Sequence, residues 1–329
     1  MHRIGAVAVL LALAGCGGDG GRGAGSEPTY VGSADANGSP VTEPTATATD
    51  PSPDELASEE AAELAELAQK LASEQPQTSA IPPRTEPVVG GDISWPQCPK
   101  GMGIPHKMSL GAPLPTAEAE YVVIGLTNGP GFHANPCLQS QVDWAHEAGL
   151  LTAAYAVASF PDEATLATYG GEGPFDGSTA RGALQNTGYQ QALFNLASME
   201  QTGLQSPLVW IDVEPVSHYE WSADKEDNAA VVQGVARAYL DAGLRIGVYS
   251  TPYLWDVVVG DLAFGVPEWR AAGQTSMAEA LSRCGPDWSI QGGPAVLGQW
   301  VEDHRDKNVT CPDVALDLGR WFSAYSGPS

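Results

Sequence analysis

Basic side chains are scarce in this chain. Its 15 Lys and Arg residues stand against 40 Asp and Glu residues, which gives a formal net charge of −25. The acidic excess is general, because residues 17–89 and residues 90–329 both carry a negative balance. Such a surface repels phosphate backbones, so nucleic acid is excluded as an expected partner.

Patterns that indicate metal, cofactor or serine chemistry are missing as well. The cysteines show no Cys-x-x-Cys spacing, and the six His residues show no spacing typical of metal ligands. Ser250 lacks the Gly-x-Ser-x-Gly context of a serine hydrolase. We find no Gly-rich phosphate loop, so neither a metal nor an organic cofactor is expected.

The sequence also lacks an apolar run long enough for a stable transmembrane helix. Residues 4–13 form an apolar run of about ten residues after a short polar start, as in a signal peptide. The run ends in Leu13-Ala14-Gly15-Cys16, which resembles a bacterial lipobox, where the peptide is cut before a cysteine that is then lipidated. We therefore expect residues 1–16 to direct export and Cys16 to anchor the protein to the outer face of the cell membrane. An ordinary secretory signal with a stray cysteine is the alternative.

Residues 17–89 form a low-complexity stretch rich in Gly, Ser, Thr, Pro and Ala. Such a composition cannot bury enough apolar surface to fold compactly, so a disordered tether is expected. A helix is predicted near residues 53–75, because Ser52-Pro53-Asp54-Glu55 is typical of a capping box. A solvated spacer is the favoured interpretation of this helix, and a partner-binding helix is the alternative.

Four cysteines remain beside Cys16, an even number that indicates disulfides in an exported chain. Three connectivities are possible for four cysteines. We favour Cys98–Cys137 and Cys284–Cys311, because each pair is local in sequence and lies just past strand ends. A zinc site is the weaker alternative.

Residues 90–329 alternate between apolar strand-like runs and amphipathic helical runs in their first part. Strands with little helix between them are expected in the last part, at residues 266–271, 295–301 and 314–318. This order predicts an α/β fold, a TIM-like (β/α) barrel with an incomplete helical ring, in which five β/α units precede three strands. A doubly wound open sheet is the alternative. The Gly-, Pro- and acid-rich residues 160–177 are expected to form a loop over the barrel mouth.

The strand at residues 207–216, PLVWIDVEPV, carries the strongest functional signal. Alternation along a strand places Trp210, Asp212 and Glu214 on one face and three aliphatic residues on the other. The aliphatic face suits a layer of helices, and the first face leads from an apolar interior to two carboxylates at a strand's carboxyl end. Each carboxylate opposes ionisation of the other, which can leave one as an acid near neutral pH.

Several segments of residues 90–329 resemble, in the same order, the family 25 glycoside hydrolases, known as Chalaropsis-type muramidases. The matching segments are GGDISWPQ, YVVIGLTNGPGFHANP, AAYAVAS, WIDVEP, GVYSTPYLW, PEWRA and VALDLGRW. Each motif is weak alone, and their order is the evidence. The resemblance implies an eight-stranded barrel with five early helices and three late bare strands.

The chain also departs from the family pattern. Ala156 follows Tyr155, where an aromatic–His pair is frequent, and the Trp-Gln-Tyr strand of the family reads Gly298-Gln299-Trp300. The opening His-Trp-Gln-Gly is replaced by Trp95-Pro96-Gln97-Cys98. This opening, with its paired cysteines, resembles an exported actinobacterial branch of such barrels. Retained acids with altered sugar contacts indicate a changed substrate or lost activity.

The resemblance implies roles for four acids. Glu214 would donate the proton to the leaving oxygen, and Asp212 would orient an N-acetyl group or stabilise the charged intermediate. Asp92 and Asp317 would hold hydrogen bonds and raise the pKa of Glu214, with loop capping as the structural alternative for both. Five aromatic residues are candidates for stacking on sugar faces, although each alone is more often a core residue: Trp95, Tyr155, Tyr249, Trp255 and Trp300.

We therefore expect a surface-tethered, monomeric glycoside hydrolase, similar to a lysozyme-like muramidase, that acts on peptidoglycan or a related cell-wall glycan. The alternative is a non-catalytic barrel that binds cell-wall glycan. A scaffold for other surface proteins through the helix near residues 53–75 has weaker support. Contact with the membrane is expected through the lipid anchor only.

Overall fold

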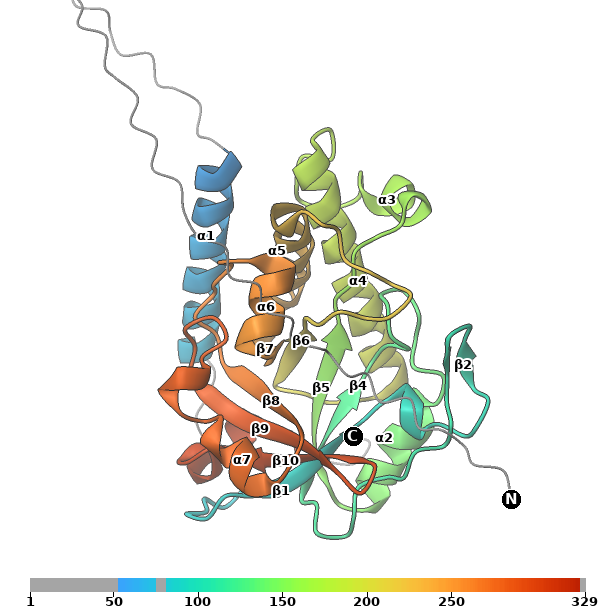
Figure 1. The fold of residues 1–329 in the computed structure, drawn as a ribbon, viewed down its shortest axis with the longest axis vertical. Helices are drawn as coiled ribbons and strands as arrows, with labels where there is room; N and C mark the ends of the chain where they lie inside the picture. The colour runs from blue at the N-terminus through green and yellow to red at the C-terminus, as the bar shows by residue number, and fades with distance from the viewer. Residues whose placement is uncertain (1–52, 75–80, 326–329) are drawn as a thin grey trace, which may run out of the picture. The chain divides into compact units, whose positions relative to one another are not determined.

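The computed structural model describes residues 53–74 and 81–325, which belong to one compact unit. The predicted signal peptide, Cys16 and the first part of the predicted tether lie outside these residues. Eight strands close a barrel in the order β1-β10-β9-β8-β7-β6-β5-β4 (Figure 1). The expected α/β barrel is therefore confirmed in place of an open sheet. The barrel strands are β1 (Val89–Ile93), β4 (Tyr121–Gly125), β5 (Leu151–Val157), β6 (Leu208–Asp212), β7 (Arg245–Ser250), β8 (Glu268–Gln274), β9 (Ala295–Glu302) and β10 (Arg305–Thr310), and a small hairpin of β2 (Gly103–Ile104) and β3 (Lys107–Met108) follows β1.

The last strand of the barrel runs against its neighbours. β10 is antiparallel to both β9 and β1, whereas the other adjacent strands of the barrel are parallel. The strand expected at residues 314–318 is wrong, because these residues lie in the 3-10 helix η3 (Val314–Arg320). The eighth strand comes earlier, after a tight turn at Asp303 and His304, which both have positive φ. An antiparallel hairpin needs only such a turn, whereas a parallel strand needs a crossover.

Alternation along the strands separates two apolar layers. Leu208 and Trp210 of β6 pack inside the barrel with Trp269 of β8. Val209 and Ile211 point outward and pack in the layer between barrel and helices. The two faces predicted for residues 207–216 are therefore confirmed, and they place the end of β6 at the barrel rim.

The helices pack around the barrel, and α4 packs against α5 (Figure 1). A side chain at Gly188 or Gly234 would meet the backbone of the opposite helix, so glycine allows this close approach. Residues 160–177, expected as a loop over the mouth, contain α3, which packs on α4 instead. The helices are α1 (Pro53–Glu74), α2 (Leu138–Glu147), α3 (Glu163–Tyr169), α4 (Ala180–Thr202), α5 (Lys225–Asp241), α6 (Pro252–Val259) and α7 (Met277–Ser282).

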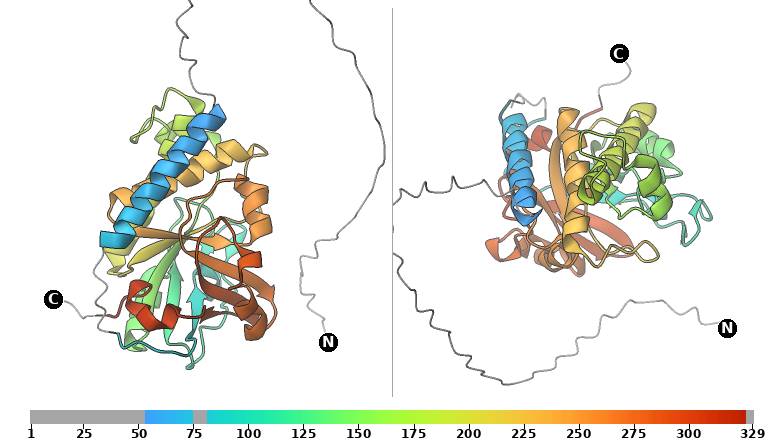
Figure 2. Two further views of the ribbon diagram at one scale, coloured as in Figure 1. Left: turned by 90° about the vertical axis from the view of Figure 1, so that its left-hand side faces the viewer. Right: turned by 90° about the horizontal axis from the view of Figure 1, so that it is seen from above.

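Helix α1 docks against the outside of the barrel. Ala61, Leu64 and Ala68 form its buried stripe, and the helix packs against α5 and β7 (Figure 2). The helix predicted near residues 53–75 is thus present, but its interpretation as a solvated spacer is wrong. None of the helices within residues 53–74 and 81–325 is both long and apolar enough to cross a bilayer.

Hydrogen bonds from α4 and α5 hold α1 in place, in addition to its apolar stripe. Glu60 of α1 accepts hydrogen bonds from Arg181 of α4, at 3.1 Å from Nε and 2.7 Å from Nη2. It also accepts one from Gln185 at 2.7 Å. Gln233 of α5 donates to the carbonyl of Ala57 at 3.0 Å. The docked position of α1 is therefore specified by directional contacts as well as by burial.

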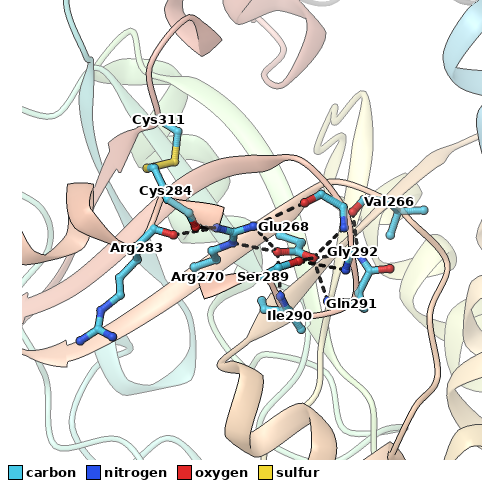
Figure 3. Close-up of polar contacts among 12 residues, drawn as sticks. Val266, Glu268, Arg270, Arg283, Cys284, Ser289, Ile290, Gln291, Gly292 and Cys311 are labelled. Atoms are coloured by element: carbon cyan, nitrogen blue, oxygen red, sulfur yellow. Dashed lines mark hydrogen bonds and ion pairs between the residues drawn. A yellow bond between two sulfur atoms is a disulfide. The ribbon is translucent and has the colours of Figure 1, made fainter. Parts of the chain in front are cut away.

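The outer face of β8 carries a buried ion pair (Figure 3). Arg270 Nη2 lies 2.6 Å from Glu268 Oε2, and the side chains of Glu268 and Arg270 are 0% and 4% exposed. Arg270 also donates to the carbonyls of Arg283 and Gly285, at 2.8 and 2.7 Å. Glu268 accepts backbone N–H bonds at 2.8 to 2.9 Å from Ile290, Gln291 and Gly293. The pair thereby fixes the segment 283–293 against the barrel wall.

Two disulfides tie loops to the barrel, Cys98–Cys137 and Cys284–Cys311. Both favoured pairings are confirmed. The first links the segment after β1 to the start of α2, and the second links the end of α7 to the end of β10. Each bridge joins neighbouring loops at the ends of the barrel elements.

Candidate active site

A cavity of about 230 Å³ opens at the carboxyl end of the parallel strands. Four carboxylates line it: Asp92 from β1, Asp212 at the end of β6, Glu214 just after β6 and Asp306 from β10. The barrel therefore brings together acids that are far apart in the sequence. The aromatic residues in its wall are Trp95, Tyr155, Tyr249 and Trp269.

Asp306 reaches this rim because β10 is antiparallel. Gly91 of β1 pairs with Lys307 of β10, so Asp92 and Asp306 are the next pair across the two strands. The amino end of an antiparallel strand lies beside the carboxyl ends of its neighbours. The sequence did not point to Asp306, because β10 is largely polar and lacks the apolar stretch by which the other strands were predicted. The short Asp303-His304 turn was the available signal for a hairpin.

Asp317 lies at the opposite end of the barrel, so its expected place in the site is wrong. It belongs to η3, where the carbonyl of Arg320 accepts a hydrogen bond from Arg245 at the amino end of β7. The charge of Asp317 acts on Arg245, whose pKa burial lowers to about 10, with Asp317 opposing that change. An antiparallel last strand carries the following chain away from the rim, and Asp306 stands where the sequence predicted Asp317.

Asp92 is held by two amide side chains. Gln299 Nε2 donates to its two oxygens at 3.2 and 3.1 Å, and Asn308 Nδ2 donates to Oδ2 at 2.7 Å. The Tyr249 hydroxyl donates to Gln299 Oε1 at 2.7 Å, and the Trp269 indole donates to Asn308 Oδ1 at 2.7 Å. These outer bonds orient both amides toward Asp92. The network fixes Asp92 and connects it to two aromatic residues of the cavity wall.

Burial raises the pKa of Asp92 well above its ordinary value, and the charge of Asp306 raises it further. The hydrogen bonds from Gln299 and Asn308 act in the opposite direction. Burial also raises the pKa of Asp212 well above its ordinary value, and the charges of Glu214 and Asp92 add to this. Removing a carboxylate from water disfavours its charged form, and nearby like charges do the same.

Glu214 lies nearer the mouth, where it is partly exposed. Burial raises the pKa of Glu214, the positive charge of Lys107 lowers it, and the charge of Asp306 raises it. Burial likewise raises the pKa of Asp306, against a hydrogen bond with Gln97. Within residues 53–74 and 81–325, no group of three His, Cys, Asp or Glu side chains is placed to hold a metal ion. The raised pKa values of the four carboxyls favour their protonated forms.

Asp212 offers an unsatisfied acceptor to a bound molecule. Its side chain is 3% exposed, and Oδ1 has no hydrogen-bond partner among the residues that the structure describes. A buried polar atom left without a partner costs about 1–3 kcal/mol. Because Asp212 lines the cavity, a ligand that donates a hydrogen bond there would remove this cost.

Three of the five aromatic candidates lie at the cavity. Trp95, Tyr155 and Tyr249 line it, together with Trp269, which was not among the candidates. Both tyrosines pack on Trp269, with ring centroids 5.7 Å away for Tyr155 and 4.5 Å for Tyr249. Aromatic faces beside carboxyls suit a ligand with both apolar faces and polar edges.

The other two aromatic candidates are core residues, so their predicted sugar contacts are wrong. Trp255 is 2% exposed on α6, where its indole donates to the carbonyl of Leu262 at 2.7 Å. Trp300 is 3% exposed and packs with Ala280 on the outside of the barrel. Gln299 points inward, so its neighbour Trp300 must point outward on the same strand.

Two comparisons with protein sequences reach parts of this chain. The family model described as Lysozyme-like protein 1 matches residues 179–279, which include β6 and Asp212. Counting factor 45-1 of Dictyostelium discoideum is 35% identical over 77 residues, which are 23% of this chain and 25% of that protein. The chain thus matches about a quarter of that relative's length. The lysozyme-like match agrees with the resemblance seen in the sequence.

Solved structures with a similar chain path include a family GH25 lysozyme from Aspergillus fumigatus. It is 18% identical with a TM-score of 0.46, and the match covers 71% of this chain and 98% of that one. A glycosyl hydrolase 25 of Streptococcus pneumoniae, described as a virulence factor in host cell invasion, is 14% identical with a TM-score of 0.44. That match covers 80% of this chain and 98% of the other. Identity this low does not transfer an activity.

Proposed function

We propose that this barrel hydrolyses glycosidic bonds of peptidoglycan or a related cell-wall glycan. The observation that carries the proposal is the cluster of four carboxyls with raised pKa at one barrel rim, beside aromatic side chains. Glycosidic cleavage needs one carboxylic acid to protonate the leaving oxygen, and a second carboxylate to stabilise positive charge or activate water. The lysozyme-like family model, which covers β6, supports the same chemistry.

Glu214 is the proton donor in this proposal, because it is the more accessible carboxyl of the pair and burial raises its pKa. Asp212 lies deeper, and its unpartnered Oδ1 receives the N–H of a substrate amide such as an N-acetyl group. Asp92 supports the site through its two amide partners. Asp306 has the role that the sequence analysis assigned to Asp317, because the charge of Asp306 raises the pKa of both Glu214 and Asp92.

The proposal places the enzyme outside the cytoplasmic membrane as a monomer. Residues 1–16 serve as the export signal and the lipid on Cys16 as the anchor, and residues 17–52 connect this anchor to α1. Two disulfides support the export, because such bonds persist in oxidising compartments. The wall glycan is then within reach of a protein anchored beside it.

The test uses purified protein and isolated cell walls, with new reducing ends as the measurement. Glu214→Gln removes the proton donor at nearly constant size, and we expect the rate to fall by about 10²–10⁴-fold. Asp317→Asn is the matched control, because Asp317 lies at the other end of the barrel, and we expect the wild-type rate. Equal background release by wild type and Glu214→Gln would show that the barrel does not catalyse this reaction.

A non-catalytic glycan-binding barrel is the second candidate. Lys107 favours it, because a positive charge beside Glu214 lowers the pKa of the proposed proton donor. This candidate predicts that insoluble wall material retains wild type and Glu214→Gln equally, while neither releases reducing ends. A protein that passes through wall material without retention would contradict it.

A further inference from the structure

Two loops from different strands meet beside the candidate active site. The β2–β3 hairpin follows β1, and the second loop follows β6. The rings of His106 and His218 stack, with centroids 4.2 Å apart and planes at 19°. The Tyr219 hydroxyl also donates to the carbonyl of Pro105 at 3.4 Å. We call this contact, formed by Pro105, His106, His218 and Tyr219, the rim bridge.

The hairpin side of the rim bridge is held from beneath by Asn128. Asn128 Oδ1 accepts the backbone N–H of Ile104 at 3.0 Å, and its Nδ2 donates to the carbonyl of Lys107 at 3.0 Å. These two bonds flank His106, whose φ is 66°. A histidine in the left-handed region is uncommon, so the flanking contacts hold it there.

The other side of the rim bridge is a turn in the loop that follows β6. Val216 and Tyr219 form an antiparallel bridge, and the Trp221 indole donates to the carbonyl of Glu214 at 2.9 Å. His218, with φ of 72°, lies inside this turn. The loop that carries the proposed proton donor is therefore the loop that reaches the hairpin.

The barrel order decides what the rim bridge covers. β4 and β5 lie between β1 and β6 around the barrel, so a contact between the loops after β1 and β6 passes over the ends of β4 and β5. Lys107, which follows His106, and Val216, which pairs with Tyr219, line the cavity, and so does Thr127 from the loop after β4. The residues beside the rim bridge thus form the cavity wall on its β4–β5 side.

We propose that the rim bridge makes this site act at the end of a glycan chain and not in its interior. This inference rests on the proposed function. A chain entering from the β8–β10 side stops at the bridge, so the cleaved bond lies a fixed number of sugars from the chain end. Water adds across the glycosidic bond, whose leaving oxygen takes the proton of Glu214. A cavity of about 230 Å³ lies below the roughly 300–1,000 Å³ typical of drug-sized ligands, which suits a short terminal segment.

The experiment compares full-length protein with a variant whose bridge is opened. The triple variant His106→Gly/His218→Gly/Tyr219→Phe removes both rings and the hydroxyl that donates to Pro105. Glycine accepts the positive φ at positions 106 and 218. Asp313→Gly is the matched control, because Asp313 is also exposed with a positive φ, at 68°, but precedes η3 at the opposite end of the barrel. The substrate is a preparation of long, uncrosslinked glycan strands from cell walls. Reducing ends and the distribution of strand lengths are measured together over time.

We expect wild type and Asp313→Gly to release short products of uniform size while the remaining strands keep their length. At the same number of cleaved bonds, the triple variant shortens the strands at internal positions. Early internal cleavage by wild type would overturn the inference while leaving the hydrolysis intact. Release of the same uniform short products by the triple variant would also overturn it, once its thermal unfolding matches that of Asp313→Gly. If wild type yields no reducing ends, the proposed function fails and this inference fails with it.

Discussion

Replacement of Glu268 by Gln tests what holds the barrel wall at β8. Glu268 is fully buried, pairs with Arg270 at 2.6 Å, and accepts backbone N–H bonds from the segment 283–293 (Figure 3). Glutamine keeps the size of the side chain but removes its charge. It also places N–H donors where the surrounding backbone N–H groups require an acceptor. Arg270, only 4% exposed, is left without its counter-charge.

The expected loss of stability follows from burial of the pair. Removing one partner of a buried ion pair costs about 3–5 kcal/mol, because the other charge stays buried and uncompensated. In a domain of about this size each kcal/mol lowers Tm by about 2–4 °C. We therefore expect Glu268→Gln to lower Tm by about 6–20 °C.

The measurement is scanning calorimetry of the protein with its disulfides intact. Asp256→Asn is the matched control, because it removes the carboxylate of an exposed ion pair. Asp256 Oδ1 lies 3.3 Å from Lys225 Nζ, and the side chains of Asp256 and Lys225 are 65% and 46% exposed. Such surface pairs contribute roughly 0–1 kcal/mol. A double-mutant cycle with Arg270→Met separates the ion pair from the backbone contacts of Glu268.

The reasoning would be refuted if Glu268→Gln melted within about 2 °C of wild type, since one kcal/mol alone gives that shift. It would also be refuted if the surface control lost as much stability as the buried variant. A large loss confined to Glu268→Gln would instead show that this carboxylate organises the segment beside Cys284–Cys311.

Two further predictions concern the acid cluster and α1. Asp306→Asn removes a charge that raises the pKa of Glu214. The proton donor then loses its proton at lower pH, so the alkaline limb of the profile of kcat/KM against pH shifts to lower pH. An alkaline limb at the wild-type pH would contradict this coupling. Glu60→Ala removes the acceptor of Arg181 and Gln185, and we expect faster amide hydrogen exchange in α1 with the barrel unchanged. Wild-type protection of α1 would show that its apolar stripe alone holds it.

Local patterns in the sequence were enough to predict the two faces of the strand at residues 207–216 and the pairing of the cysteines. The two faces of residues 207–216 follow from the two-residue period of a strand, which any partner strand preserves. The pairs Cys98–Cys137 and Cys284–Cys311 join segments only 39 and 27 residues apart. In each case the decisive information lies within a short stretch of chain, so it can be read without knowing the neighbours.

Contacts between distant segments decided the rest. Asp92 meets Gln299 across 207 positions of sequence, and the antiparallel direction of β10 brings Asp306 to the rim while taking Asp317 away from it. The docking of α1 likewise depends on Arg181, which lies 121 positions from Glu60. Side-chain periodicity specifies which face of an element is buried, but it contains no information on which element covers that face or in which direction it runs. Only closure of the barrel supplies both.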